Sequence, residues 1–323
     1  MLTALLLLAV GLVAYTNGAN ANFKGVASLY GSGTTSLRGA LWWGTATTLA
    51  GSIAALLLAE GMLKKFSGRG LVPDTLVQSP DFIFAVALGA ALTSLLATKL
   101  GFPVSTTHAL VGALVGAGFA GSGNGSEVHL GALGKSFIYP LFLSPVVAVL
   151  VGGTSYLLLK SLRLAPDHRT RMLDALHYLS AGAASFARGL NDTPKMVALL
   201  LVVPSFDPRL AFVVIALTMA LGALLDADKV AETLGKKVTD MNPGQGFAAS
   251  LSTAVLVTTA SLHSLPVSTT HVSVGSLLGI GVTTRQAKWR KVGEILFAWI
   301  TTLPCAALLA AVVYWLLRLA VSR

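Results

Sequence analysis

Charged residues are scarce in this chain. Only 11% of its 323 residues are Asp, Glu, Lys or Arg, whereas 54% are hydrophobic. A soluble domain carries about 25% charged residues, and no polar stretch here is long enough to fold separately. The composition therefore predicts an all-α polytopic membrane protein in which residues 1–323 form a single transmembrane domain.

Acidic residues are the scarcer of the two charge classes. The 13 Asp and Glu face 23 Lys and Arg, which gives a formal net charge of +10. In a soluble protein this excess would point to nucleic acid, but here the basic residues gather in short loops, where membrane topology places them. We therefore expect a lipid bilayer and no nucleic acid as partner, with part of the positive charge available to an anionic substrate.

Cysteine is nearly absent. Cys305 is the only one, so an intramolecular disulfide is excluded. Its apolar surroundings in the sequence predict a core position.

The first hydrophobic run also lacks a basic residue ahead of it. No Lys or Arg precedes Lys24, although a signal peptide needs a basic n-region. The run "MLTALLLLAVGLVAY" is shorter than the roughly 20 apolar residues of a membrane span, and the Ala19-Asn20-Ala21 that follows has the A-x-A form of a cleavage site. We interpret the polar stretch "NGANANFKG" at 17–25 as a break in a membrane helix.

Two stretches of the chain occur twice. "PVSTTH" stands at 103–108 and again at 266–271, an offset of 163, and "GANANFK" at 18–24 aligns with "GLNDTPK" at 189–195, an offset of 171. This duplication divides the chain into repeat 1, residues 1–165, and repeat 2, residues 166–323. Because the opening stretch recurs in mid-chain, we expect it to belong to the mature protein.

Each repeat holds five hydrophobic segments. If each segment crosses the membrane once, an odd number brings repeat 2 in from the opposite face. This predicts two inverted-topology repeats, a common plan of secondary transporters, with broken helices meeting near the bilayer midplane. Whether the two PVSTTH segments cross or re-enter stays open. The segments are about 1–36 (interrupted), 39–60, 80–98, 103–120 and 134–160 in repeat 1, and about 173–204 (interrupted), 208–226, 244–262, 266–283 and 292–318 in repeat 2.

Basic residues favour one orientation of such a chain. With the N-terminus outside, twelve fall on the inner side and seven on the outer side, as the positive-inside rule requires. The sequence thus predicts a multi-pass protein of the plasma or inner membrane with both termini outside. The inner group is Arg38, Lys160, Arg163, Arg169, Arg171, Lys229, Lys236, Lys237, Arg285, Lys288, Arg290 and Lys291, and the outer group is Lys64, Lys65, Arg69, Lys135, Arg209, Arg318 and Arg323.

Each PVSTTH motif is expected to begin a helix. Its hydroxyl residues suit an N-cap, and the residues behind it are small at i and i+4, which favours close helix packing. Buried amides at a helix start need partners, and an oxyanion supplies them. An ordinary capped membrane helix is the alternative, but the duplication inside apolar sequence favours a binding site. His108 and His271 either shuttle protons or have a structural role.

The stretch "NDTPKMVALLL" is also expected to begin a helix, with Pro194 at the first helical position and Asp192 or Thr193 as the cap. Asp192 paired with Arg188 would need no substrate. A carboxylate in a membrane segment is costly, however, and usually marks an ion path. A sodium ion or a proton on Asp192 would remove its repulsion of an anion, so the pattern favours cation–anion symport. Asn20, Asn191 and Asp192 supply the oxygen atoms that suit sodium.

Helix starts also set the expected charge of the ligand. Each offers about half a positive charge, so four converging starts give roughly two charges, which matches a dianion such as hydrogen phosphate or sulfate. Lys24, Lys99, Arg188 and Lys195 are further candidates for anion binding, unless they only line the site or extend to the membrane surface.

The paired PVSTTH motifs and the paired G-x-N-[D]-x-x-K motifs resemble the inorganic phosphate transporter (PiT) family over nearly the whole chain. The resemblance implies a secondary active transporter and not an enzyme, with inverted repeats and a homodimeric assembly. It implies symport of inorganic phosphate with sodium or protons, or transport of a metal–phosphate complex, and no cofactor besides the coupling ion. The residues implied in anion contact are Ser105, Thr106, Thr107, Ser268, Thr269 and Thr270, and those lining a shared anion and cation site are Asn20, Asn191 and Asp192.

The sequence departs from the family at one position. The first family motif reads Gly-Ala-Asn-Asp, whereas position 21 here is Ala, and the internal repeat sets Ala21 against Asp192. One of two symmetric carboxylates is missing. A different coupling ion or stoichiometry, a different oxyanion, or an engineered substitution would each account for this.

Three other functions compete with phosphate symport. A sulfate permease of the same fold would bind a similar tetrahedral dianion, and a passive anion channel would need no carboxylate. A membrane-embedded hydrolase would use Ser or Thr with His108 or His271, but no oriented acid partner is evident, and duplication of the nucleophile argues against it.

Overall fold

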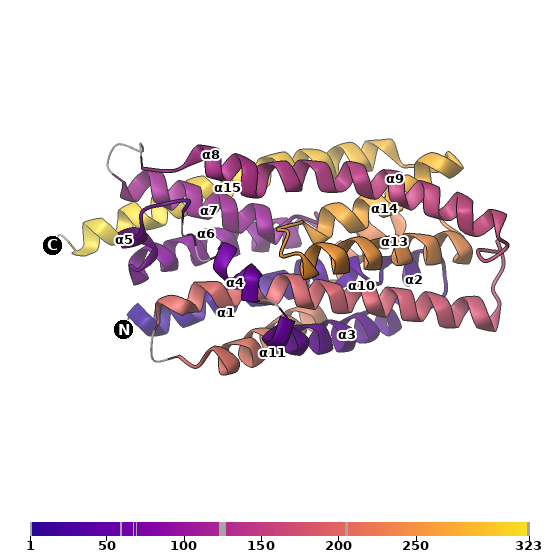
Figure 1. Ribbon diagram of the computed structural model, residues 1–323, viewed down its shortest axis with the longest axis horizontal. Helices are drawn as coiled ribbons and strands as arrows, with labels where there is room; N and C mark the ends of the chain where they lie inside the picture. The colour runs from indigo at the N-terminus through magenta and orange to yellow at the C-terminus, as the bar shows by residue number, and fades with distance from the viewer. Residues whose placement is uncertain are drawn as a thin grey trace.

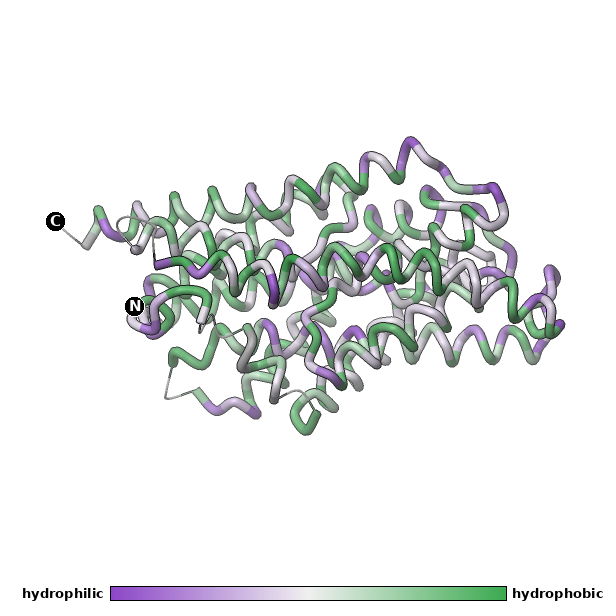
Figure 2. Tube along the Cα trace, turned by 45° about the horizontal axis from the view of Figure 1, so that its top comes forward, coloured by the Kyte–Doolittle hydropathy of each residue, from purple (hydrophilic) through white to green (hydrophobic). Residues whose placement is uncertain are grey.

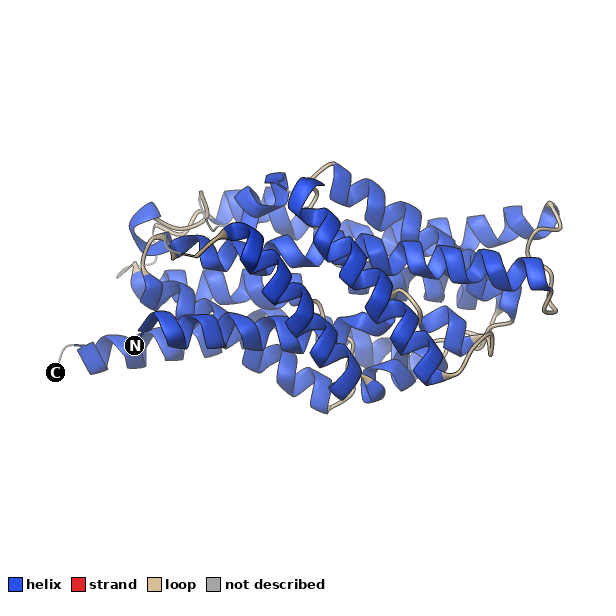
Figure 3. Ribbon diagram, turned by 90° about the horizontal axis from the view of Figure 1, so that it is seen from below, coloured by secondary structure: helices blue, strands red, loops and turns tan. Residues whose placement is uncertain are grey.

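The computed structural model describes residues 2–58, 60–66, 68, 70–122, 127–203 and 206–321. Within these ranges every named element is a helix, as the composition predicts (Figure 3). Hydrophobic residues run along most of the trace, and hydrophilic ones concentrate at its two ends and at points in its middle (Figure 2). The chain is therefore a helical bundle with a polar interior region.

The elements of repeat 1 follow the predicted segments. The interruption in the first segment falls at Asn22–Lys24, directly after the helical part of the NGANANFKG stretch. The elements are α1 (Leu2–Ala21), the 3-10 turn η1 (Asn22–Lys24), α2 (Ala27–Gly31), α3 (Leu37–Leu58), α4 (Glu60–Phe66), α5 (Asp74–Val77), α6 (Pro80–Lys99), α7 (Thr106–Gly121), α8 (Leu130–Leu133), the π-helical η2 (Gly134–Ile138) and α9 (Tyr139–Ser161).

The elements of repeat 2 recur at the sequence offsets. α6 and α13 are separated by 163 at both ends, as are α7 and α14, whereas α2 and η3 are separated by 171. The offset falls from 171 at η3 to 163 at α13, so repeat 2 is shorter than repeat 1 in the stretch between these two elements. They are α10 (Arg171–Val197), the 3-10 helix η3 (Ala198–Val202), α11 (Pro208–Asp226), α12 (Asp228–Lys236), α13 (Pro243–Leu262), α14 (Thr269–Thr284) and α15 (Trp289–Val321).

Several helices are long and apolar enough to cross a membrane. In the described part of the chain six segments qualify, and α7, with 16 residues, is shorter than a span. The polytopic membrane architecture expected from composition is therefore confirmed. The six are Leu2–Lys24, Leu37–Leu58, Pro80–Lys99, Leu130–Ser161, Pro208–Asp226 and Trp289–Ala320.

Corresponding helices of the two repeats run in opposite directions. Both termini lie at one end of the molecule; α1 and α9 run away from that end, whereas α10 and α15 return to it (Figure 1). The pair α6–α7 occupies the half nearer the termini, and α13–α14 occupies the other half. As a result, α7 and α14 both begin near the middle of the molecule.

Helices of one repeat pack against helices of the other. α7 packs on α15 and α14 on α9, while α1 packs on α11 and α10 on α3. Glycines allow this close approach: a Cβ at Gly116 would lie 1.9 Å from the Ala307 carbonyl oxygen of α15. The close packing predicted from small residues behind PVSTTH is thus confirmed.

Two of these close contacts are related by the repeat. Gly18 of α1 lies against the backbone of Met219, and Gly189 of α10 lies against the backbone of Thr48. Each partner is offset from its counterpart by 171, so the contact occurs twice with the repeats exchanged.

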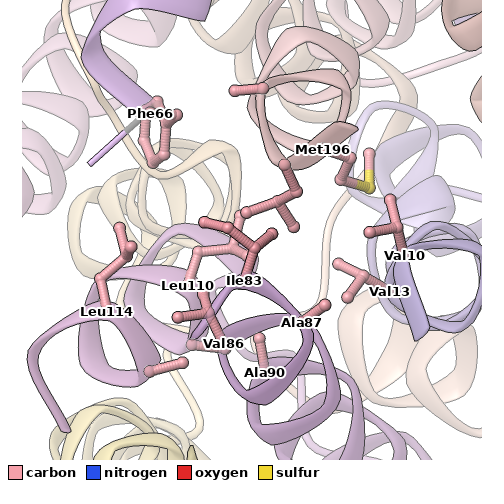
Figure 4. Close-up of a cluster of buried hydrophobic side chains, with 14 of the residues drawn as sticks. Val10, Val13, Phe66, Ile83, Val86, Ala87, Ala90, Leu110, Leu114 and Met196 are labelled. Carbon is pink, nitrogen blue, oxygen red and sulfur yellow. The ribbon is translucent and has the colours of Figure 1, made fainter. Parts of the chain in front are cut away.

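Two hydrophobic clusters flank the middle of the bundle. One, in the half that holds the termini, includes Val10, Phe66, Ile83 and Leu110 (Figure 4). The other includes residues of α2, α12, α13 and α14. The polar interior lies between them.

The prediction that Cys305 is a core residue is wrong. Its side chain is exposed on α15. A lipid-facing surface is as apolar as a membrane protein's interior, so hydrophobic neighbours in the sequence do not distinguish the two positions.

Candidate anion and cation site

Four charged side chains are buried in the described part of the chain: Lys24, Arg188, Asp192 and Lys195. Three are positive and one is negative, so their net charge is plus two. They come from η1 and α10, close to the starts of α7 and α14. Buried charges in a membrane protein are costly and mark functional positions.

Asp192 is held by several donors. Its Oδ1 accepts from Lys195 Nζ at 3.0 Å, and Arg188 Nε lies 3.7 Å from Oδ2. Oδ2 also accepts from Asn17 Nδ2 at 3.3 Å and from Thr269 Oγ1 at 3.4 Å. Spacings of three and four residues place both cations on the same face of α10 as the carboxylate. The pairing of Asp192 with Arg188 that the sequence suggested is therefore confirmed.

The predicted helix start at "NDTPK" is wrong. α10 runs without interruption from Arg171 to Val197, with Pro194 inside it, and the irregular turn comes later, at Ala198–Val202. Asp192 is therefore an ion-paired residue within a helix and not an N-cap. In a membrane, continuing the helix satisfies most backbone groups, and the environment tolerates the one amide that proline lacks.

The PVSTTH motifs do begin helices. Ser105 Oγ accepts from the His108 amide at 3.1 Å, and Ser268 Oγ accepts from the His271 amide at 3.2 Å. The amides of the first turn, at Thr106 and Thr107 in α7 and their counterparts in α14, have no partner within their helix. Thr270 Oγ1 donates to Val104 O at 2.8 Å, so the two starts meet.

Asn20 and Asn191 brace the helices that precede these starts. Asn20 Nδ2 donates to Thr98 Oγ1 at 3.0 Å, and Asn191 Nδ2 donates to Ser261 Oγ at 3.0 Å. Thr98 and Ser261 are themselves repeat-related, with an offset of 163. The Oδ1 atoms are also engaged: that of Asn20 accepts from the Val104 amide at 2.9 Å, and that of Asn191 accepts from Lys195 Nζ.

Lys24 and Lys195 occupy equivalent positions with different surroundings. Lys24 Nζ donates to Val104 O at 2.9 Å, and Lys195 Nζ donates to Val267 O, the repeat-related carbonyl, at 3.2 Å. Beside Lys195 stands Asp192, whereas beside Lys24 stands the buried Ala21. Among the described residues, Lys24 forms no ion pair.

Asn17 belongs to this cluster, although it was not among the predicted site residues. It accepts from Arg188 Nη2 through its carbonyl oxygen at 3.2 Å and through Oδ1, and its Nδ2 donates to Thr106 Oγ1 at 2.9 Å. The signal was available in the sequence: the offset of 171 aligns Asn17 with Arg188. Two aligned positions that touch each other lie where the two repeats meet.

Two further predictions concern Lys99, proposed for anion binding, and the two histidines, proposed either to shuttle protons or to have a structural role. Lys99 is 56% exposed and pairs with Asp226 at 3.0 Å, so the structure does not bring it to the site. The His108 and His271 rings lie 4.7 Å apart, and His271 stacks on Trp299 at 4.0 Å. Both histidines are buried next to the helix starts.

Hydrogen bonds link predicted ligands through shared partners: Asn20 and Thr270 both contact Val104, and Asn191, Asp192 and Thr107 all contact Lys195 Nζ. The structure gathers Asn20, Asn191, Asp192 and the PVSTTH hydroxyl residues in one buried cluster. Sodium ligation by Asn20, Asn191 and Asp192, and anion contact by the six hydroxyl residues, remain predictions.

Comparison with known proteins agrees with this arrangement. Residues 17–310 match the model of the phosphate transporter family. A probable low-affinity inorganic phosphate transporter of Rhizobium meliloti (strain 1021) is 32% identical over 262 residues, 77% of either chain. A protein of the same description from Mycobacterium bovis is 30% identical over 318 residues, covering 94% of this chain and 75% of that one.

A solved structure shares the fold. It is described as the sodium-dependent phosphate transporter and superimposes with a TM-score of 0.83, covering 98% of this chain and 99% of that one, at 22% sequence identity. The relatives are transporters and not enzymes, as the sequence predicts. With its paired motifs gathered in one buried cluster and its match to the family model over residues 17–310, this chain belongs to the phosphate transporter family.

Proposed function

We propose that this chain is a secondary active transporter that carries inorganic phosphate together with a cation, sodium or proton. The observation that carries the proposal is the net charge of plus two buried between the starts of α7 and α14. Hydrogen phosphate, a dianion, balances this charge, and neutralisation repays part of the cost of burying it.

The anion binds beside Lys24 in this proposal. The backbone amides of Thr106, Thr107, Thr269 and Thr270 have no partner within their helices, and such helix starts are natural oxyanion sites. Asp192 would repel an anion, but Lys195 and Arg188 neutralise it. Ala21 leaves the Lys24 ammonium without a carboxylate, and phosphate takes that role.

Transport requires the site to open to either side. Every member of the cluster is buried, so this conformation is closed. We propose that the repeats are inverted and that their exchange of conformations opens the two ends in turn. The opposite directions of α1 and α10 support this topology. If α6–α7 and α13–α14 are re-entrant hairpins, each repeat keeps three crossings, which is still an odd number. The homodimer implied by the family resemblance remains a prediction.

The end opposite the termini is the proposed cytoplasmic end. Basic loops gather there: Arg169 reaches Gly33 O, and Lys288 Nζ donates to Lys236 O at 2.8 Å. The positive-inside rule then places both termini outside. Arg69 and Arg323 of the outer group lie outside the described residues.

Uptake of radiolabelled phosphate into proteoliposomes tests the proposal. Sodium and proton gradients are imposed separately, and unlabelled sulfate competes in a parallel series. We expect phosphate accumulation driven by one cation gradient. Sulfate uptake without phosphate uptake would identify a sulfate permease, and flux indifferent to both gradients would identify a passive anion channel.

A further inference from the structure

Lys195 is surrounded by oxygen atoms as a bound metal cation would be. Its Nζ donates to Thr107 Oγ1 at 2.8 Å, to Asp192 Oδ1 at 3.0 Å, to Val267 O at 3.2 Å and to Asn191 Oδ1. An ammonium has three N–H donors, fewer than the four oxygens it faces. These oxygens come from α10, α7 and the segment before α14. A simple ion pair with Asp192 would need only one of them.

This oxygen set includes two of the three predicted sodium ligands. Asn191 and Asp192 direct their Oδ1 atoms at Nζ, and a backbone carbonyl and a hydroxyl complete the shell. Carboxylate, amide, carbonyl and hydroxyl oxygens are the ligands that hard cations take. The ring of Phe66, a member of the hydrophobic cluster, has its centroid 5.6 Å from Nζ.

We infer that the Lys195 ammonium takes the place of the co-transported sodium ion, so that phosphate uptake by this chain does not depend on sodium. The inference rests on the proposed function and concerns the identity of its coupling cation. A tethered cation neutralises Asp192 and keeps the anion site attractive. Because it never leaves the protein, it collects no energy from a sodium gradient. The proposed function named sodium or a proton as the coupling cation, and the inference leaves the proton in that role.

The equivalent position in repeat 1 provides a matched contrast. Of the oxygen types around Lys195 Nζ, Lys24 Nζ contacts only the repeat-related valine carbonyl, that of Val104. Ala21 has no carboxylate, and Asn20 Oδ1 accepts from the Val104 amide instead. Removing the Lys24 ammonium would therefore expose no comparable oxygen shell. The two lysines are distinguishable by what surrounds them.

The experiment compares the wild type with Lys195→Asn and Lys24→Asn in proteoliposomes. Phosphate uptake is measured in sodium medium and in choline medium of equal ionic strength. We expect the wild-type rate to be the same in both media. Lys195→Asn is expected to be slow in choline and stimulated about tenfold by sodium, because the ion fills the vacated shell. Lys24→Asn loses the proposed partner of the anion and is therefore expected to be slow in both media, with no sodium stimulation.

A binding measurement gives a second readout. The melting temperature of the detergent-solubilised proteins is recorded in sodium chloride and in choline chloride. We expect sodium to stabilise Lys195→Asn selectively and to leave the wild type unchanged. If Lys195→Asn does not fold, the inference is tested by the wild type alone, compared in sodium and in choline.

Sodium-driven accumulation or sodium-induced stabilisation of the wild type would overturn the inference while leaving phosphate symport intact. Absence of sodium stimulation in a folded Lys195→Asn protein would overturn it too. Failure of the wild type to move phosphate under any gradient would instead refute the proposed function.

Discussion

At the scale of single residues, the local features of the site were predictable from the sequence, whereas the contacts of the charged residues were not. Ser105 and Ser268 were predictable as caps because a serine before two threonines is a helix-start pattern that is local in sequence. The oxygen shell of Lys195 was not predictable, because Thr107 and Val267 reach it from elements far along the chain. The sequence repeat supplied the equivalence of Lys24 and Lys195, but only packing distinguishes them.

Asp192→Asn should abolish phosphate uptake and lower the melting temperature while leaving a folded protein. The substitution raises the buried net charge from plus two to plus three and leaves Arg188 and Lys195 without a carboxylate, at a cost of about 3–5 kcal/mol. The control is Asp226→Asn, whose partly exposed pair with Lys99 is worth about 1 kcal/mol or less. Normal uptake in a stable Asp192→Asn protein would reduce this residue to a structural role.

Ala21→Asp should fold, because the new carboxylate lies three residues before Lys24, as Asp192 lies three residues before Lys195. It competes with phosphate for the Lys24 ammonium and lowers the buried net charge from plus two to plus one. We therefore expect the apparent KM for phosphate to rise by about tenfold or more. Initial uptake rates over a range of phosphate concentrations measure this, and an unchanged KM would separate Lys24 from the anion site.

At the scale of helices, hydrophobic runs predicted the segment bounds well, because each run ends where polar loops begin. The error came at Pro194, where a local rule about helix starts met a membrane environment that tolerates proline inside a helix. Small residues behind PVSTTH correctly predicted close packing, but the identity of the partner helix required the structure.

Gly116→Ala should destabilise the contact between α7 and α15. The added Cβ would meet the Ala307 backbone, so the helices must separate, at a cost of about 1–3 kcal/mol. Gly293→Ala in α15 is the control: its Cβ would meet no atom within 4 Å, and alanine favours a helix over glycine. Thermal melting of both variants in one detergent should therefore move in opposite directions. Equal midpoints would show that this contact is not tight.

At the scale of the whole molecule, the two repeats form one bundle by exchanging partners, so neither is expected to be stable alone. Duplication was legible in the sequence because both motifs recur. The sequence did not predict that helices of one repeat pack against helices of the other, because this depends on which helix surfaces fit together. Both termini lie at one end, and this agrees with an odd number of crossings in each repeat.

The orientation of the bundle can be checked by cysteine labelling in a Cys305→Ala background. A membrane-impermeant maleimide should label Thr75→Cys in intact cells, because this exposed residue belongs to α5, which lies at the end that holds the termini (Figure 1). His168→Cys, exposed in the loop between α9 and α10, should react only after the membrane is opened. The reverse pattern would place the termini inside.

The reciprocal contacts of Gly18 with Met219 and of Gly189 with Thr48 have a consequence for direction. If the repeats exchange conformations during transport, the two contacts exchange roles between the outward-open and inward-open forms. A methyl group added at one of them penalises one form, and a methyl group at the other penalises the opposite form. Import and export would then respond unequally to each change, so the two glycine positions provide a test of the direction of transport.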